Sequence, residues 1–400
     1  MSFAVVVGAG PAGLMAAEEL AKRGHSVTVA DQMPSVGRKF LMAGKSGLNL
    51  TKVEPADRFV STYSHLPEPV RMAVGAFGPD EVQSWAIGLQ QSLITGSTGR
   101  VFPSVMKASP LLRAWIARLS DLGVRFQTRW RAKQVRPGCV IFDRPDGEMT
   151  LSPDCVVVAL GGASWSRLGS DGQWADWIGQ LGAKLAPFAA SNVGVRMTWS
   201  AHMTRYFGQP LKNIVLRAGD LTSTAEAIVT ESGLEGGGIY LLSPALRAGA
   251  TLRINLLPDL TKGEIAEKLS QASGKQSTSN RLRKSLKLPP VKQSLLREFD
   301  PEALKDPRAT AAAITDLHMP YDRLGDLDEA ISTAGGLCAS ELTDSFMLRR
   351  QPGVFAAGEM LDWDAPTGGY LLTACLASGR AAGIGAASWL SSNDGSSLPT

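Results

Sequence analysis

The chain has 400 residues, of which 44% are hydrophobic and 20% charged, and its formal net charge is +4. These values are typical of a soluble globular protein with two or three domains and a large core. The mild charge and dispersed Lys and Arg do not favour a nucleic-acid partner. The four cysteines are isolated, so neither a dithiol redox pair nor a zinc knuckle is predicted.

The first 31 residues carry the strongest signal. In order they contain an apolar run at 3–7, Gly8, Gly10 and Gly13, a helical stretch at 14–23, and a β-like run at 26–30 that ends at Asp31. This order is typical of a dinucleotide-binding βαβ unit. We expect Gly8 to allow the tight turn, Gly10 to leave room for a pyrophosphate, and Gly13 to bring helix and strand together. The alternative is a glycine-rich turn in an ordinary α/β domain.

Two of these features predict contacts to the cofactor. The N-terminus of the helix presents free N–H groups and a positive dipole end to phosphates. The carboxylate of Asp31, 18 positions after Gly13, is placed to accept hydrogen bonds from ribose hydroxyls.

The segment that follows, residues 31–51, indicates which dinucleotide binds. It is a Gly-rich basic loop, whereas a nicotinamide dehydrogenase normally continues into another helix. Arg38 and Lys39 could neutralise a pyrophosphate. Gly44, Gly47 and Asn49 could let the backbone lie close to a flat ring, which favours a flavin. Taken alone, the loop could also be a solvated basic loop.

The middle of the chain shows two changes of pattern. Helical spacing at 82–89 and 111–119 is followed by a predicted run of short antiparallel strands at 124–128, 131–135, 139–142 and 148–151. The apolar strand 155–159 then leads to Gly161 and Gly162, beside the dinucleotide site. From about residue 192 a β-rich insertion is predicted, with strands at 193–197, 214–217, 227–230 and 251–256.

The later part of the insertion is polar and helical. Residues 259–315 hold a capping-box pattern at 261–264 and a basic run at 281–284, whose simplest interpretation is a solvated helix face. A strand at 330–333 is predicted to return to the first domain. The apolar stretch 371–390 is rich in Ala and Gly and contains Arg380, so it predicts a buried helix rather than a membrane span.

The second strong motif lies near the C-terminus. A strand with a Gly–acid step, 353–362, is followed by Thr367-Gly-Gly-Tyr370 and a helix of small residues. The acid could hydrogen-bond a ribityl chain, and the amides at the start of the helix could face the electron-rich edge of an isoalloxazine. The alternative is a second loop of an α/β sheet.

With these motifs the chain resembles the BaiN/YhiN-like NAD(P)/FAD-dependent flavoproteins of bacteria over nearly its whole length. The segments that carry the resemblance are 8–13, 37–39 with 49–51, 159–162, 333–336, 358–362 and 367–370. The resemblance implies an α/β fold with a Rossmann-like, glutathione-reductase-type FAD-binding domain at 1–190 and 334–400. It also implies an inserted β domain at 191–258 and 319–333 and a helical subdomain at 259–318.

The resemblance implies non-covalent FAD and names its contacts. They are Gly8, Gly10, Gly13, Asp31, Arg38, Lys39, Asn49, Leu50, Val135, Gly161, Gly162, Gly358, Glu359, Asp362, Gly369, Tyr370 and Leu371, and we add the adjoining Pro11, Ala12, Gln32 and Ala159. The chain departs from the family where many members have a cysteine and it has Leu48, and at 235–240, where many have a Ser-Gly-Pro turn. These departures indicate a divergent branch.

The predicted function is an FAD-dependent oxidoreductase acting on a small organic substrate. Only one GxGxxG occurs, so NAD(P)H would dock transiently or another donor would reduce the flavin. The alternatives are an RNA-modifying flavoprotein, gripping RNA through its basic helical insert, and an FAD-binding sensor without turnover. No catalytic acid is assigned; the candidates are Tyr206, Tyr240, His202, His318 and Tyr370. A cytoplasmic location and a substrate cleft between insert and flavin are expected.

Overall fold

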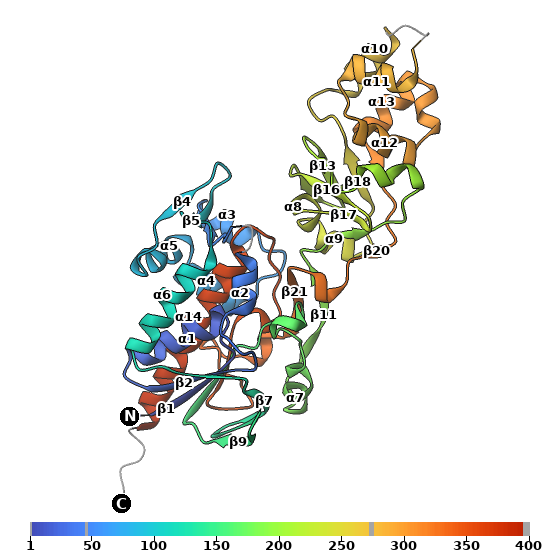
Figure 1. The fold of residues 1–400 in the computed structure, drawn as a ribbon. Helices are drawn as coiled ribbons and strands as arrows, with labels where there is room; N and C mark the ends of the chain where they lie inside the picture. Colours follow the sequence, from blue (N-terminus) through green and yellow to red (C-terminus); the bar gives the residue numbers. More distant parts are fainter. Residues whose placement is uncertain (1, 45–46, 272–275, 395–400) are drawn as a thin grey trace, which may run out of the picture. The chain divides into compact units, whose positions relative to one another are not determined.

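The computed structural model describes residues 2–44, 47–271 and 276–394, and the chain forms two compact units (Figure 1). Unit 1 is built from the chain up to Ala189 and again from Ser332 onward, and unit 2 is Ala190–Ile331. The predicted Rossmann-type α/β fold with an inserted β-rich and helical region is confirmed. The finer boundaries given above stay a prediction.

The centre of unit 1 is a five-stranded parallel sheet. Its strand order is β22 (Val354–Ala356), β10 (Cys155–Val158), β1 (Phe3–Val7), β2 (Ser26–Asp31) and β6 (Arg125–Thr128), and every neighbouring pair is parallel. Strands buried on both faces read as continuous apolar runs, and Val5, Val156 and Val157 are fully buried. The register aligns the last residues of β1, β10 and β22, so the loops after them meet at one edge.

Two helices of small residues pack against each other in unit 1. They are α1 (Pro11–Lys22) and α14 (Tyr370–Asp394). A Cβ added at Gly379 would lie 2.2 Å from the Ala12 oxygen, and one at Gly383 would lie 2.7 Å from the Ala16 oxygen. The glycines therefore permit the close packing, and the predicted buried helix is confirmed. Within the described part of the chain, no helix is long and apolar enough to cross a bilayer.

One strand prediction is wrong. β6 is not the first strand of an antiparallel run; it pairs in parallel with β2 at the edge of the main sheet. Helix α6 (Ala108–Asp121) precedes β6 and supplies the crossover that parallel pairing needs. After β6, Arg129 adopts a positive φ of 61°, and the chain turns out of the sheet. The antiparallel run therefore begins one strand later, with β7 (Arg131–Arg136), β8 (Cys139–Arg144) and β9 (Gly147–Leu151).

The remaining elements of unit 1 surround this frame (Figure 1). An antiparallel sheet is formed by β3 (Thr51–Lys52), β5 (Arg100–Pro103) and β4 (Leu93–Thr95), and a two-stranded sheet by β11 (Leu185–Ser191) and β21 (Ser332–Leu337). The helices are α2 (Arg38–Ala43), α3 (Ala56–Ser61), α4 (Glu68–Ala76), α5 (Pro79–Gly88) and α7 (Trp174–Gln180), with 3-10 turns η1 (Ser166–Leu168), η5 (Ala339–Glu341) and η6 (Gly358–Met360). The helices expected at 82–89 and 111–119 are thus present as α5 and α6.

Unit 2 combines two sheets with short helices. One sheet has the order β13 (Pro210–Leu211), β16 (Ala227–Thr230), β17 (Gly233–Glu235), β12 (Val195–Arg196) and β20 (Arg323–Leu324). The other has the order β15 (Leu221–Ser223), β14 (Val215–Ala218), β18 (Leu252–Asn255) and β19 (Leu317–His318). The helices are α8 (Gly237–Tyr240), α9 (Ser243–Arg247), α10 (Lys262–Ser270), α11 (Thr278–Leu286), α12 (Pro290–Phe299) and α13 (Pro307–Thr315), with η2 (Ala201–Tyr206), η3 (Glu302–Lys305) and η4 (Leu327–Glu329).

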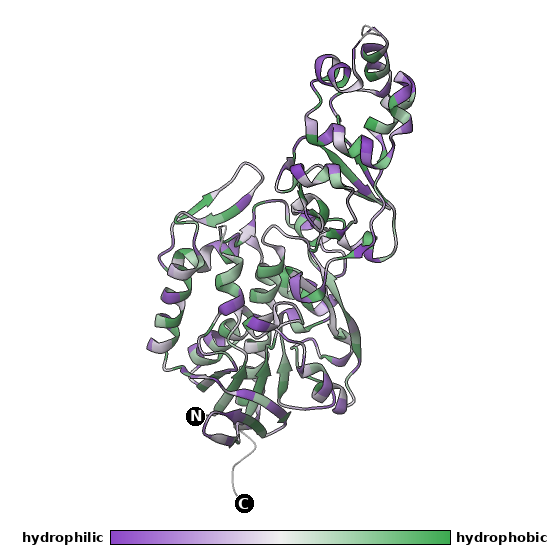
Figure 2. Ribbon diagram, turned by 45° about the vertical axis from the view of Figure 1, so that its right-hand side comes forward, coloured by the Kyte–Doolittle hydropathy of each residue, from purple (hydrophilic) through white to green (hydrophobic). Residues whose placement is uncertain are grey.

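Each unit has its own hydrophobic core. In unit 2 a single cluster joins strand residues such as Val229 to helix residues such as Leu282 and Leu295, all fully buried. Figure 2 shows apolar residues along the strands of unit 1, and apolar and polar residues in turn along the helices of both units. The predicted capping box also forms, because Glu264 accepts from the Thr261 N–H at 2.8 Å.

Candidate functional site

The turn after β1 has the geometry expected from its three glycines. Gly8 has a φ of +105°, and a Cβ there would lie 2.2 Å from the Ala159 oxygen. A Cβ at Gly13 would lie 1.9 Å from the Gly8 oxygen, so only glycine lets α1 pack this close to the turn. A Cβ at Gly10, in contrast, would meet no heavy atom within 4 Å. The turn therefore leaves open space beside Gly10 and nowhere else among the three glycines.

The N-terminus of α1 faces this turn without a side-chain cap. Gly10 is the N-cap residue, and Pro11 occupies the first helical position, where its missing N–H costs nothing. The first amide bonded within the helix is that of Leu14, which donates to the Gly10 oxygen at 2.9 Å. The amides of Ala12 and Gly13 therefore precede the hydrogen-bonded ladder, which is the arrangement that binds phosphate at a helix start.

Asp31 lies at the end of β2 and holds the same turn. Its carboxylate accepts from the Ala9 and Met33 amides, both at 2.8 Å. Burial raises the pKa of Asp31, and the two backbone N–H bonds partly oppose that rise. Each carboxylate oxygen keeps a second lone pair, so the predicted ribose contact stays a prediction alongside this structural role. The neighbouring Gln32 donates to the Gly169 oxygen at 2.8 Å.

Two buried polar atoms of the predicted cofactor loop have no hydrogen-bond partner among the described residues. They are Nε of Arg38, at the start of α2, and Oδ1 of Asn49. A buried unsatisfied donor or acceptor costs about 1–3 kcal/mol unless a ligand or water pairs with it. An unpaired hydrogen-bond donor and an unpaired acceptor in this loop could both bind a polar cofactor that carries phosphate and heterocyclic groups. Leu50, the next predicted contact, is fully buried, and its amide donates to the Val101 oxygen.

Lys39 and Glu359 form an ion pair that links distant parts of unit 1. The Lys39 Nζ lies 2.6 Å from Glu359 Oε2 and donates to the Ser164 hydroxyl at 2.8 Å. The other oxygen of Glu359 accepts from the Thr333 amide at 3.1 Å. α2, the loop after β10, β21 and η6 therefore converge on one polar cluster. The sequence predicts Lys39 at a pyrophosphate and Glu359 at a ribityl chain. It gives no sign of the contact between these two residues, because 320 positions separate them.

The loop after β10 carries two glycines with different tasks. Gly161 has a φ of +72°, and its oxygen accepts from the Trp174 indole at 2.8 Å. A Cβ at Gly162 would lie 2.5 Å from the Thr333 side chain. Trp174 and Ser164 were not predicted as site residues. Ser164 lies two residues after Gly162, and this proximity was the available signal; nothing in the sequence pointed to Trp174.

η6 brings the last motif beside the first turn. Gly358 has a φ of +85°, and a Cβ there would lie 2.7 Å from the Ala12 Cβ. Asp362 follows on the same segment, with its Oδ2 3.7 Å from His65 Nε2. The first and last predicted motifs are therefore adjacent in the fold. Val135, the predicted adenine neighbour, is fully buried on β7, and its proposed backbone contact stays a prediction.

The start of α14 is tightly packed on β3. Gly369 has a φ of +97°, and a Cβ there would lie 2.5 Å from the Thr51 Cα. The Tyr370 ring is buried, and its hydroxyl donates to Glu54 and accepts from Lys52 at 3.0 Å. With its hydroxyl engaged inside the protein, Tyr370 would reach a cofactor through its backbone amide. That amide and the amide of Leu371 precede the first intrahelical bond, from the Thr373 amide to the Gly369 oxygen.

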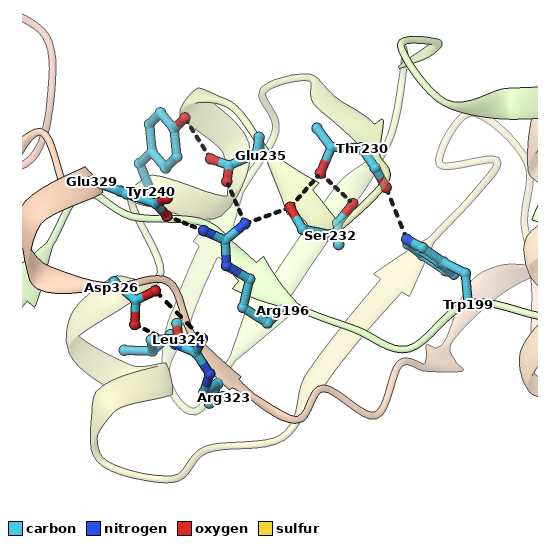
Figure 3. A network of polar contacts seen from close by, with 11 residues as sticks. Arg196, Trp199, Thr230, Ser232, Glu235, Tyr240, Arg323, Leu324, Asp326 and Glu329 are labelled. Carbon is cyan, nitrogen blue, oxygen red and sulfur yellow. Dashed lines mark hydrogen bonds and ion pairs between the residues drawn. The ribbon is translucent and has the colours of Figure 1, made fainter. Parts of the chain in front are cut away.

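The other candidate proton donors lie in unit 2. Tyr240 donates to Glu235 Oε2 at 2.8 Å, and burial together with this carboxylate raises its pKa to about 12. Figure 3 shows this pair within a network that includes Arg196, Glu329 and Ser232. His202 is held between Ser200 and Glu298, His318 is exposed on β19, and Tyr206 is buried. None gains a catalytic assignment, and the expected cleft stays a prediction.

Among residues 2–44, 47–271 and 276–394, no group of three or more His, Cys, Asp or Glu side chains could hold a metal ion.

Comparison with known proteins gives the family. The model for the HI0933-like protein Rossmann domain matches residues 2–385, which is nearly the whole chain. The chain belongs to this family. The BaiN/YhiN-like resemblance drawn from the motifs is thereby confirmed.

Relatives of this HI0933-like protein include two enzymes that match over almost their full lengths. One is the ribosomal RNA dihydrouridine synthase of Escherichia coli K12, 24% identical, with 92% of this chain and 93% of the relative covered. The other is the 3-dehydro-bile acid delta(4,6)-reductase of Clostridium scindens, also 24% identical, with 96% and 98% covered. Among solved structures, a flavocytochrome c3 fumarate reductase in an open conformation aligns with a TM-score of 0.55. The two chains are 16% identical, and the alignment covers 97% of this chain and 78% of the fumarate reductase chain. At this identity the likeness shows the fold alone.

Proposed function

We propose that this protein is an FAD-dependent oxidoreductase that reduces a carbon–carbon double bond conjugated to a carbonyl group. The observation that carries the cofactor assignment is the glycine-rich edge of the parallel sheet. There the open space beside Gly10, the uncapped start of α1 and the unpaired Arg38 Nε and Asn49 Oδ1 lie on consecutive segments of unit 1. Phosphates, ribose and a heterocycle together match these donors, acceptors and spaces.

Different residues of the chain would bind different parts of the cofactor. The first turn and Arg38 would hold the pyrophosphate, Asp31 the ribose, and Glu359 with Asp362 the ribityl chain. The amides at the start of α14 would face the pyrimidine edge of the ring, where the dipole of this 25-residue helix stabilises negative charge. Bound FAD would supply hydride transfer. NAD(P)H is the proposed electron donor; since the chain has one GxGxxG, it would dock transiently.

The names of the two relatives support the bond that we propose. A Δ4,6-reductase of a 3-dehydro bile acid and a synthase of dihydrouridine both saturate a C=C bond conjugated to a carbonyl. Saturating such a bond takes one hydride, which adds at an electron-poor carbon of the conjugated system, and one proton, which adds at the other carbon of the bond, while the donor is oxidised. The reaction class is therefore shared, although one substrate is a small molecule and the other is RNA.

A small molecule is our first candidate substrate, and uridine in RNA is the second. A specific observation favours keeping the second: residues 268–297 contain eight Lys or Arg and no Asp or Glu.

The experiment that tests the reaction starts with the protein under anaerobic conditions. It is mixed with NADH or NADPH, and reduction of the flavin is followed by absorbance. The reduced protein would then receive a panel of cyclic enones, or a uridine-rich RNA analysed by mass spectrometry for the gain of two hydrogens.

The proposal predicts that at least one acceptor reoxidises the flavin anaerobically and is itself saturated. Reduction of the flavin with no acceptor of either class turned over would contradict the reaction. A flavin that no donor reduces would favour the sensor alternative.

A further inference from the structure

One short stretch of unit 2 departs from the otherwise dispersed distribution of Lys and Arg. Residues 268–297, from the end of α10 through α11 and into α12, carry eight Lys or Arg and no Asp or Glu. The whole chain has a net charge of only +4, so the rest of the chain is net negative. One of the eight, Lys275, lies outside the described residues. The mild overall charge therefore hides a local basic segment.

α11 turns part of this charge to solvent. Leu282 and Leu286, four residues apart, are buried in the core of unit 2. Arg283, Lys284 and Lys287 are exposed. Residues three and four apart are neighbours on a helix surface, so these three cations, which we call the α11 basic face, lie within one helical turn of one another.

The α11 basic face has little to neutralise it within the described parts of the chain. Arg283 donates to the Asn280 side chain at 3.0 Å, which is a neutral partner. No ion pair to a carboxylate is formed by Arg283, Lys284 or Lys287 among the described residues. Like charges at this spacing destabilise a helix by about 0.2–0.5 kcal/mol per pair. The helix dipole favours cations in this last turn of α11 and offsets part of that repulsion, and a polyanion would remove the rest.

We propose that the α11 basic face binds the phosphate backbone of RNA. A row of cations without interleaved acids matches a chain of phosphates, and such contacts need no particular base sequence. A membrane surface fits less well, because a helix that binds bilayers also presents large apolar residues for insertion. No large hydrophobic side chain is exposed in the described part of 259–318. The proposal deepens the second candidate substrate given above, because both rest on residues 268–297; it concerns binding alone, and its test reads binding without requiring the reaction.

The test uses the full-length protein and a short fluorescent oligouridine, with anisotropy read between about 50 and 200 mM salt. The variant Arg283→Gln/Lys284→Gln/Lys287→Gln removes the charges without touching the buried leucines. Each phosphate contact to a single strand contributes about 0.7 to the log–log salt slope, so losing three should flatten it by about 2 and weaken binding about tenfold or more.

The matched control is Arg113→Gln/Arg125→Gln/Arg349→Gln, three exposed cations of unit 1. It should leave both affinity and slope nearly unchanged. Circular dichroism and flavin content should be equal in all three proteins. An equal loss of binding in the control, or a wild-type protein that does not bind oligouridine, would overturn the proposal. So would α11-dependent binding to phosphatidylglycerol vesicles but not to oligouridine.

Discussion

Two polar regions, one in each unit, differ in how completely their groups are paired. At the glycine-rich edge of unit 1, backbone amides at two helix starts precede the hydrogen-bonded ladder, and Arg38 Nε and Asn49 Oδ1 are buried without partners. In unit 2, the network around Arg196 closes on itself, since Glu235 accepts from Tyr240 and Glu329 pairs with Arg196 (Figure 3). Open polar groups mark a place built for a ligand, whereas a closed network stabilises its own fold. This contrast supports our proposal that the cofactor binds unit 1.

The largest expected effect comes from filling the open space of unit 1. Gly10→Ala places a methyl group where no protein atom lies within 4 Å, at a φ of −81° that alanine adopts readily. The protein should keep its stability but lose FAD affinity by about 100-fold or more, because overpacking against a ligand costs about 3 kcal/mol. Equilibrium dialysis with FAD measures this.

Gly75→Ala is the matched control, because it also meets no atom within 4 Å, on the exposed side of α4. It should bind FAD normally and gain up to about 1 kcal/mol of stability. A Gly10→Ala protein that holds FAD as tightly as Gly75→Ala would show that the pyrophosphate lies elsewhere.

A second test removes one partner of the polar cluster in unit 1. Glu359→Ala leaves Lys39 unpaired at a site where the two side chains are 24% and 8% exposed. Breaking a buried pair costs about 3–5 kcal/mol, and the partial exposure of Lys39 places the expectation near about 3 kcal/mol. Urea unfolding measures it. Glu148→Ala breaks the exposed pair with Lys133 and should change little. Equal losses in both variants would contradict the structural role of the cluster.

A third test probes the interior of unit 2. Lys292 on α12 is buried, and its ammonium donates to the Asn213 and Leu256 oxygens at 2.8 and 2.7 Å. Burial lowers its pKa from 10.5 to about 8. Between these values the unfolded chain binds more protons than the folded one, so stability should rise with pH across this window, by about 2–3 kcal/mol.

Lys292→Met removes the titrating group and should remove this rise. Urea unfolding at pH 8 and pH 10.5 gives the difference for both proteins. A wild-type slope that persists unchanged in Lys292→Met would place its origin in another group.

The smallest expected effect concerns Asp31. Asp31→Ala should weaken FAD binding by roughly 10–100-fold, because a hydrogen bond to a charged acceptor contributes about 1.5–3 kcal/mol. The same change frees the Ala9 and Met33 amides, so the stability of the variant is measured alongside by urea unfolding. Unchanged FAD affinity in a folded variant would mean that the carboxylate does not contact the ribose.

Local patterns predicted much of unit 1. The glycine turn follows from backbone conformations that only glycine adopts easily. Periodicity and composition predict the buried helix at 371–390 and, outside unit 1, the β-rich insertion. The antiparallel assignment of β6 failed because strand pairing depends on the preceding crossover, which alternation of side chains does not encode. The Lys39–Glu359 pair and the Tyr370–Glu54 contact were missed because both join residues more than 300 positions apart.

The central claim is that unit 1 binds FAD, and the chromophore of the purified protein tests it most directly. The protein should show flavin absorbance, and heat or acid should release a compound that co-elutes with FAD, as the predicted non-covalent binding requires. FMN in the supernatant, or a folded protein that stays colourless after incubation with FAD, would contradict the account.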